Sequence, residues 1–268
     1  MRVLCLILVV ICTFSLFAQT AEKAVLKCVY LEDYVRFLEE PDNRRQDEWV
    51  LELGRNSSAF YGIWERKQLQ LRDSLSAQGA SLAEIQSAQA QHPRSHQYGE
   101  IYKNYPRRGK MTEIDKLIKF FLVEEDMPDL KWEIEDAERE VAEYVCRKAV
   151  TSFGNRTWYA WFTPEIPISD GPWKLCGLPG LILEAEDSEG HYHFRCVEIQ
   201  VVEEEDTPLW IQPLKQNYIR CSHSELQKNR VEQHTDLNGF IRKMMGITVQ
   251  TLQTTPEVEN RVWNYIER

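Results

Sequence analysis

Residues 171–187 read GPWKLCGLPGLILEAED, a segment rich in turn-forming residues that runs directly into an apolar, strand-like stretch. Its first ten residues include three Gly, two Pro and one Cys. Pro179-Gly180 is a pair typical of a type II turn, in which the Gly takes a positive φ. We expect a compact loop that packs on one end of a sheet as a lid or end-plug, or that serves only as a rigid corner. The motif at its centre comprises Gly177, Leu178, Pro179 and Gly180.

The segments around this loop have the patterns of β-strands. Residues 157–163 (TWYAWFT) are aromatic on both faces, so we expect a central strand that is covered on both sides. Residues 181–186 and 191–202 flank Asp187-Ser188-Glu189-Gly190, which predicts a hairpin with Gly at a position suited to positive φ. A further strand is expected over 141–150.

The N-terminal half is strand-like with one helical interruption. Residues 65–91 are rich in Gln, Ala, Leu and Arg with apolar residues at helical spacing, and Gly79 divides them into two halves. Residues 117–123 fit either a buried strand or a short helix. The other strands of this half are expected over 24–39, 49–54, 58–64, 99–106 and 110–123.

Two helices are expected near the C-terminus, over 222–230 and 236–245, with Asp236 as an N-cap. Neither repeats nor low-complexity linkers divide the chain. The sequence therefore predicts an α+β, β-rich fold: one curved antiparallel sheet with an inserted helical segment near 65–95 and C-terminal helices, in a single domain over residues 20–268.

The N-terminus has the features of a secretory signal peptide. Arg2 precedes an apolar run over 3–17, and Ala18 is a small residue suited to a cleavage site. We expect a signal peptide over 1–19, removed between Ala18 and Thr20. A lipoprotein signal at Cys12 is disfavoured because the bulky Ile11 precedes it. The remaining chain has no apolar run long enough to span a bilayer. The chain is thus expected to be exported, to the periplasm, the cell envelope or the medium.

Charge and cysteine content exclude some classes of function. The formal net charge of −10 opposes binding to phosphate backbones, so we expect no nucleic-acid partner. Seven cysteines become five after signal removal, an odd number without a CxxC pair or a zinc-binding spacing. We expect no metal and no other cofactor. The five cysteines are Cys28, Cys146, Cys176, Cys196 and Cys221.

Several segments resemble the GLPGLI family of exported Bacteroidetes proteins. The string GLPGLI occurs within CGLPGLILE at 176–184, and YVCRKA at 144–149 and FGNRTWYAWFTPEIP at 153–167 are similar to the same family. The closing NYIER resembles the family's Asn-Pro-Ile-Glu, with Tyr265 where Pro is usual. The match is specific over about 130–186. The resemblance implies export and a β-rich architecture, and it implies no reaction.

A disulfide between Cys146 and Cys176 is predicted from this resemblance. Both residues lie inside the segment that resembles the family, whereas Cys28, Cys196 and Cys221 lie outside it. Export supplies the oxidising compartment that such a bond needs. The alternatives are two buried, unlinked thiols or a different pair, with Cys196–Cys221 the next to consider.

Residues with chemical potential are scattered. His191 and His193 lie two apart on one strand and could share a metal, but we interpret them as polar residues on a solvent face. Cys221 with His223 is a possible nucleophile pair of low specificity. The serines Ser57, Ser58 and Ser222 lie in no nucleophile motif, and the acidic runs at 124–126 and 203–206 are interpreted as solvated faces. No catalytic residue is predicted.

Two classes of function remain. The first, which we favour, is a non-enzymatic envelope protein that binds an apolar or peptide-like ligand, or a protein partner, on its sheet; eight Trp and eleven Tyr suit such a site. The alternative is a secreted hydrolase whose site is assembled from distant residues. A cavity without converging His or carboxylates would favour binding, and a buried Ser, Cys or carboxylate with a partner in a cleft would favour catalysis.

Overall fold

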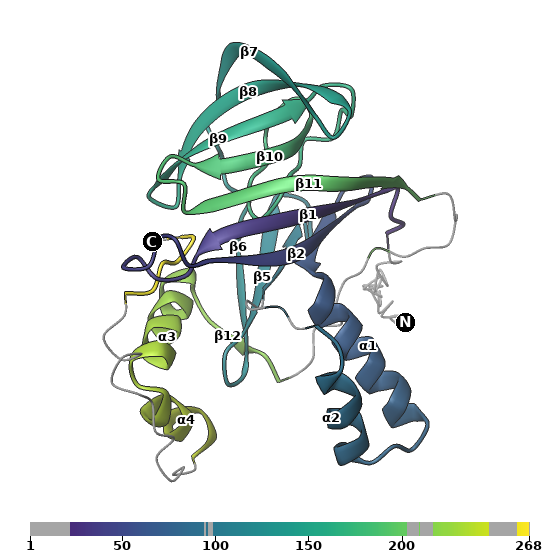
Figure 1. Ribbon diagram of the computed structural model, residues 1–268, viewed down its shortest axis with the longest axis vertical. Coiled ribbons are helices and arrows are strands. Elements are labelled where there is room, and N and C mark those ends of the chain that lie inside the picture. The colour runs from purple at the N-terminus through teal and green to yellow at the C-terminus, as the bar shows by residue number, and fades with distance from the viewer. Residues whose placement is uncertain are drawn as a thin grey trace, which may run out of the picture.

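The computed structural model describes residues 22–93, 95, 99–202, 209, 217–246 and 262–267. The predicted signal peptide and the acidic run at 203–206 lie outside these residues. The described chain forms twelve strands in one sheet and four helices (Figure 1). Its strands are β1 (Leu26–Val35), β2 (Arg44–Leu53), β3 (Ser58–Gly62), β4 (Glu100–Lys103), β5 (Lys110–Lys116), β6 (Phe120–Asp126), β7 (Glu133–Val141), β8 (Tyr144–Phe153), β9 (Arg156–Thr163), β10 (Leu181–Asp187), β11 (Tyr192–Val201) and β12 (Ile219–Arg220). Its helices are α1 (Ile63–Ala77), α2 (Leu82–Ala90), α3 (His223–Thr235) and α4 (Leu237–Met245).

The strands follow the order β12-β6-β5-β4-β3-β2-β1-β11-β10-β9-β8-β7. Most neighbours are consecutive hairpins, but β1 lies between β2 and β11 and so joins the two halves of the chain. The β-rich prediction is confirmed, with one correction: the sheet is mixed, because β12 pairs parallel with β6. This short strand returns along the sheet edge, and the Cys221 amide then donates to the Leu122 carbonyl at 3.0 Å.

Both predicted helical regions are confirmed. The inserted region divides into α1 and α2 around Gly79, whose φ of +80° requires glycine-like freedom. Near the C-terminus, the Asp236 side chain accepts the Gly239 amide at 2.8 Å, as expected of an N-cap. Both helix pairs lie on the side of β1 and β2 away from β7–β10 (Figure 1). Within the described ranges, none of the helices is both long and apolar enough to cross a bilayer.

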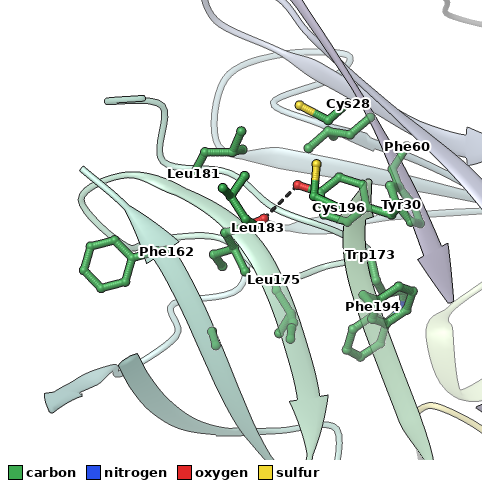
Figure 2. Close-up of a cluster of buried hydrophobic side chains, with 14 of the residues drawn as sticks. Cys28, Tyr30, Phe60, Phe162, Trp173, Leu175, Leu181, Leu183, Phe194 and Cys196 are labelled. Carbon is green, nitrogen blue, oxygen red and sulfur yellow. Dashed lines mark hydrogen bonds between the residues drawn. The ribbon is translucent and has the colours of Figure 1, made fainter. Parts of the chain in front are cut away.

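The largest core cluster joins the inner faces of the two halves of the sheet. Trp49 and Phe60 of β2 and β3 belong to the same cluster as Trp158 and Phe194 of β9 and β11. Phe60 packs against Phe194 with ring centroids 6.3 Å apart (Figure 2). Because strands on both sides of β1 contribute to one core, the sheet must curve around it.

One expectation about β9 is corrected. Its inner face is buried, whereas Tyr159 and Trp161 on the other face are half-buried. Long cationic side chains cover these rings instead of an apolar layer: Lys148 lies 4.8 Å from the Tyr159 ring and Arg139 lies 4.0 Å from the Trp161 ring. The aromatic residues of the outer face are thus compatible with a solvated surface.

The Gly/Pro-rich loop between β9 and β10 lies inside the curve of the sheet. Leu175 and Leu178 are fully buried in the largest cluster, and Trp173 packs against Trp158 at 5.5 Å. Figure 2 shows Trp173 and Leu175 among side chains from the neighbouring strands. The loop therefore fills the space between the two halves of the sheet, and does not cap an open end.

The expected type II turn at Pro179-Gly180 is not formed. Positive φ values occur earlier in the loop, at Trp173 (+52°) and Gly177 (+96°), and Gly180 has none. Gly180 is required for a different reason, since a Cβ there would lie 2.1 Å from the Thr163 carbonyl oxygen. The glycine allows close approach of two backbones rather than an unusual φ.

The substitution Gly180→Ala is expected to lower the free energy of unfolding by about 3 kcal/mol or more, because the backbone of β9 must move to make room. Gly79→Ala is the matched control: it meets no atom within 4 Å and carries only the strain of its positive φ, about 1 kcal/mol. Urea denaturation of both variants measures the difference. Equal losses of unfolding free energy in the two variants would show that the contact with Thr163 is relieved without strain.

Candidate functional site

Two buried lysines connect the loop to the other half of the sheet. The first, Lys103 of β4, is 1% exposed, and its ammonium lies 2.5 Å from the Asp170 carboxylate. It also donates to the carbonyls of Gly171 and Leu175, at 2.7 and 3.1 Å. Asp170 accepts a further hydrogen bond from Ser58 at 2.6 Å. Every donor of this ammonium is therefore used within the protein.

The second is Lys174 of the loop, which is fully buried. Its ammonium lies 2.9 Å from Glu113, 3.2 Å from Glu125 and 2.8 Å from Glu267. Burial alone would lower the pKa of Lys174, but the three carboxylates raise it above its usual value. The loop is thus tied to β5, β6 and the C-terminal tail by charges that burial makes costly to separate.

Arg230 of α3 extends this network. Its guanidinium lies 2.7 Å from Glu113 and 2.6 Å from Asp115, both on β5. Although burial opposes ionisation of Glu113, Lys174 and Arg230 hold the pKa of Glu113 well below its usual range. Glu113 is therefore a structural carboxylate that forms ion pairs with two cations, Lys174 and Arg230.

Two groups of acidic and histidine side chains lie close enough to resemble metal sites, but each already holds a cation from the protein. In the group Glu113, His223 and Glu267 this cation is Lys174. In the group Asp187, Glu189 and His191 it is the guanidinium of Arg156, which bonds to Asp187 and lies 3.2 Å from Glu189. We assign no metal to either group.

The histidines considered from the sequence are separated by their partners. His191 lies 3.1 Å from Glu189, whereas His193 bonds to Glu184 at 2.6 Å, so the two rings do not form a joint site. His223 faces Glu113 and Glu267, at 3.7 and 3.4 Å.

The thiol of Cys221, two residues before His223, is not a candidate nucleophile. Burial raises the pKa of Cys221 to about 11, whereas a nucleophilic cysteine requires a lowered value. The serines are engaged elsewhere: Ser57 bonds to Glu22, Ser58 to Asp170, and Ser222 caps α3.

All five cysteines of the described chain are free thiols. The predicted Cys146–Cys176 bond is absent; Cys146 lies mid-strand in the core, and Cys176 is buried in the loop, where its carbonyl accepts the Trp132 indole N–H at 2.8 Å. Cys28 and Cys196 are instead neighbours on β1 and β11 (Figure 2), offset across a β-bulge at Val29/Tyr30. The shared segment therefore did not predict a bond between these two thiols.

A cavity of about 240 Å³ lies between the inner face of the sheet, the loop, α3 and the C-terminal tail. One part of its wall is aromatic, and another part is formed by charged and polar side chains. The rings that line it come from β1, β2, β3, β11, the loop and the tail: Tyr34, Trp49, Phe60, Tyr192, Phe194, Trp173, Trp263 and Tyr265. Trp49 and Phe60 stack with centroids 5.0 Å apart, so this wall is rigid.

One carboxyl group, Glu32 of β1, belongs to the aromatic wall. It is 2% exposed, lies directly opposite Asp47 of β2, and accepts the Trp49 indole N–H at 2.7 Å. Burial raises the pKa of Glu32 to about 8, and the charge of Asp47 contributes to the rise. At neutral pH the cavity therefore contains a protonated carboxylic acid.

The C-terminal tail closes the cavity through Asn264. Its backbone N–H donates to the Arg36 carbonyl at 3.1 Å, and its side-chain NH₂ donates to the Val35 carbonyl at 2.8 Å. Its side-chain oxygen accepts a hydrogen bond from Arg156 at 2.6 Å, and its backbone carbonyl accepts one from the Tyr192 hydroxyl at 2.5 Å. The tail is thus fixed to β1, β9 and β11 rather than lying loosely over the opening.

Glu32, Lys174 and Asn264 are not among the site residues predicted from the sequence. A signal for Glu32 was present: in LKCVYLEDYV the alternate residues Cys28, Tyr30, Glu32 and Tyr34 share one face, and a Glu among aromatic residues on a core face is unusual. The role of Lys174 depends on carboxylates from three distant segments, which no local pattern reveals.

Lys174→Met is expected to lower the free energy of unfolding by about 3–5 kcal/mol, because Glu113 and Glu267 lose the cation between them. Lys131→Met is the control, since the Lys131–Asp129 pair is solvent-exposed and little change is expected. Adding Glu113→Gln to Lys174→Met should recover part of the loss. Denaturation curves of the three variants test this, and no difference between Lys174→Met and the control would contradict it.

Glu32 predicts a specific pH dependence. Its pKa in the folded chain, about 8, is above the ordinary value of 4.5, so the folded state holds the proton more tightly than the unfolded state. The contribution to the free energy of unfolding is therefore lost as pH rises from about 4.5 through about 8. Glu32→Gln should flatten this slope and stabilise the fold near pH 8 by roughly 2–3 kcal/mol. Glu48→Gln, on the opposite face of β2, is the control; parallel pH profiles for wild type and Glu32→Gln would exclude the raised pKa.

Comparison with known proteins supports the β-rich architecture and little more. A family model described as "Protein of unknown function (Porph_ging)" matches residues 153–184, the segment that contains β9, the loop and the start of β10. No curated protein matches the chain.

Two solved structures have a similar fold. They are "Structure of PNGF-II in P21 space group", with 11% identity and a TM-score of 0.51, and "Structure of PNGF-II in C2 space group", with 10% identity and a TM-score of 0.50. Each alignment covers 76% of this chain and 32% of the other, so the chain spans about a third of the length of PNGF-II. At this identity the likeness concerns the fold alone.

Proposed function

We propose that this chain is an exported member of the GLPGLI family that binds an apolar or peptide-like ligand in the cavity between its sheet and its C-terminal tail. The observation that carries the proposal is the cavity of about 240 Å³, part of whose wall is formed by eight aromatic rings. Concave, mostly apolar sites with a few polar groups are the usual form of ligand sites in proteins.

The size of the cavity limits what it can hold. Cavities of about 150 Å³ with apolar walls take up benzene-sized molecules. A volume of about 240 Å³ therefore has room for one aromatic or branched apolar group and a few further atoms. A larger ligand would insert one such group and leave the rest outside.

The charged groups near the cavity favour binding over catalysis. Glu113 and Asp115 are both paired with Arg230, and burial lowers the pKa of His234 to about 4, which keeps its ring neutral at physiological pH. These groups are held in fixed ion pairs or neutral forms, which stabilise a wall and leave little capacity for proton transfer.

A secreted hydrolase is the second candidate, because Glu32 combines a raised pKa with a place in a cavity. A carboxyl group that is protonated at neutral pH has the properties of a general acid. In that case Glu32→Gln would abolish turnover of a substrate while leaving its binding intact. Recovery of the ligand unchanged after long incubation would favour binding alone.

Indole and toluene are suitable probes for the proposed cavity, because each is small and apolar. We expect saturable binding, seen as quenching of tryptophan fluorescence and as a mass shift in native mass spectrometry. Gly99 also lines the cavity, and a Cβ there would meet only the Trp49 ring at an ordinary distance of 3.7 Å. Larger side chains at this position should therefore occupy the cavity without breaking the fold.

The expected result is graded: Gly99→Ala weakens probe binding slightly, and Gly99→Leu abolishes it. Thermal unfolding of both variants controls for stability. Probe binding by Gly99→Leu that equals wild type would place the probe elsewhere and would contradict the proposal.

A further inference from the structure

Among the described residues, two uncharged polar atoms at the cavity lack a hydrogen-bond partner. They are the side-chain oxygen of Gln233, on α3, and the indole nitrogen of Trp263, in the tail. Both atoms are buried, and both residues line the cavity. A buried polar atom without a partner is rare in folded proteins and indicates a missing water or ligand group.

The indole nitrogen of Trp263 is held in place by its neighbours. The Trp263 ring stacks on His234, the residue after Gln233, with centroids 3.5 Å apart. It also meets the edge of Phe37 at 4.8 Å, and the Arg36 guanidinium lies 4.6 Å from its centroid. Because the indole is packed by three side chains, its N–H keeps one direction.

The two atoms have complementary chemistry. The Gln233 oxygen accepts a hydrogen bond, and the Trp263 N–H donates one. A ligand that satisfies both must present one donor and one acceptor, next to an apolar moiety that fits among the other lining residues Trp49, Phe60 and Phe194. A residue within a peptide carries one backbone N–H and one backbone carbonyl on either side of its side chain.

We propose that the ligand is the aromatic residue of a peptide: its ring occupies the cavity, its amide N–H donates to Gln233, and its carbonyl accepts from Trp263. This inference rests on the proposed function and specifies its ligand class. A free amino acid fits less well, because its charged ends would need counter-charges, and the nearby ions Arg230, Glu113 and Asp115 are paired with one another.

Two probes distinguish the contribution of the amide group to binding from that of the aromatic ring. N-acetyl-L-phenylalanine amide carries both, and propylbenzene carries only the ring. Trp263→Phe keeps an aromatic ring and removes the N–H, and Gln233→Leu keeps the volume and removes the acceptor. Trp64→Phe and Gln78→Leu are matched controls on α1 and at its C-terminal end, outside the residues that line the cavity.

Isothermal titration calorimetry should give tighter binding of the amide probe than of propylbenzene to wild type. Each of Trp263→Phe and Gln233→Leu should raise the Kd of the amide probe by about tenfold, the effect of losing one buried hydrogen bond, and leave that of propylbenzene unchanged. The two control variants should match wild type with both probes. Circular dichroism and thermal unfolding establish that each variant is folded, and the two substitutions test the inference independently.

The other outcomes have distinct meanings. If wild type binds both probes equally, or if Trp263→Phe and Gln233→Leu weaken both probes alike, the two polar atoms hold water or shape the wall, and the peptide inference is overturned while the cavity remains a binding site. If neither probe binds wild type, the proposed function fails and the inference fails with it.

Discussion

The fold depends on the pairing of two ammonium groups inside the protein. Lys103 and Lys174 are almost completely buried, and a charge in such a place is tolerated only with well-placed partners. The partners of Lys103 belong to the loop, and those of Lys174 belong to β5, β6 and the tail. The loop, the curved sheet and the C-terminus can therefore reach their positions only together.

The cavity is a consequence of this arrangement. Ion pairs on one side hold the loop, α3 and the tail at fixed distances from the aromatic strands, and the rigid rings of Trp49, Phe60 and Phe194 cannot spread into the space that remains. An apolar core alone would be expected to close such a gap to native packing density. Ion pairs among the charged lining residues and stiff aromatic rings elsewhere in the wall keep the volume open.

Local patterns in the sequence predicted the elements well and their contacts poorly. Gly79, Asp236 and the hairpin at 187–190 act through turn and cap chemistry that a few neighbouring residues determine, and all three are confirmed. The parallel pairing of β12 rests on two residues, too few for a pattern. At Gly180 the sequence could not distinguish a glycine needed for positive φ from one needed for its missing Cβ. Glycine is the residue expected in both cases.

The candidate site was less accessible to prediction, because its members come from segments far apart in the chain. Glu32 and Trp263 carry no motif, and their importance follows only from burial and from the groups that they face. The predicted pairing of Cys146 and Cys176 shows the same limit: membership in one sequence segment says little about which face each thiol occupies. Pairing depends on register, as the neighbouring positions of Cys28 and Cys196 demonstrate.

The place of β1 between β2 and β11 has a consequence for biogenesis. Leu26 pairs with Val201, so the central ladder of the sheet cannot form until most of the polypeptide has been synthesised. A high contact order of this kind slows folding and leaves strand edges unpaired in the meantime. During translation the emerging chain therefore leaves β1 and β10, the two neighbours of β11 in the sheet, as temporary unpaired edges. Late closure would thus leave the nascent protein dependent on protection from aggregation until β11 has paired with both of these strands.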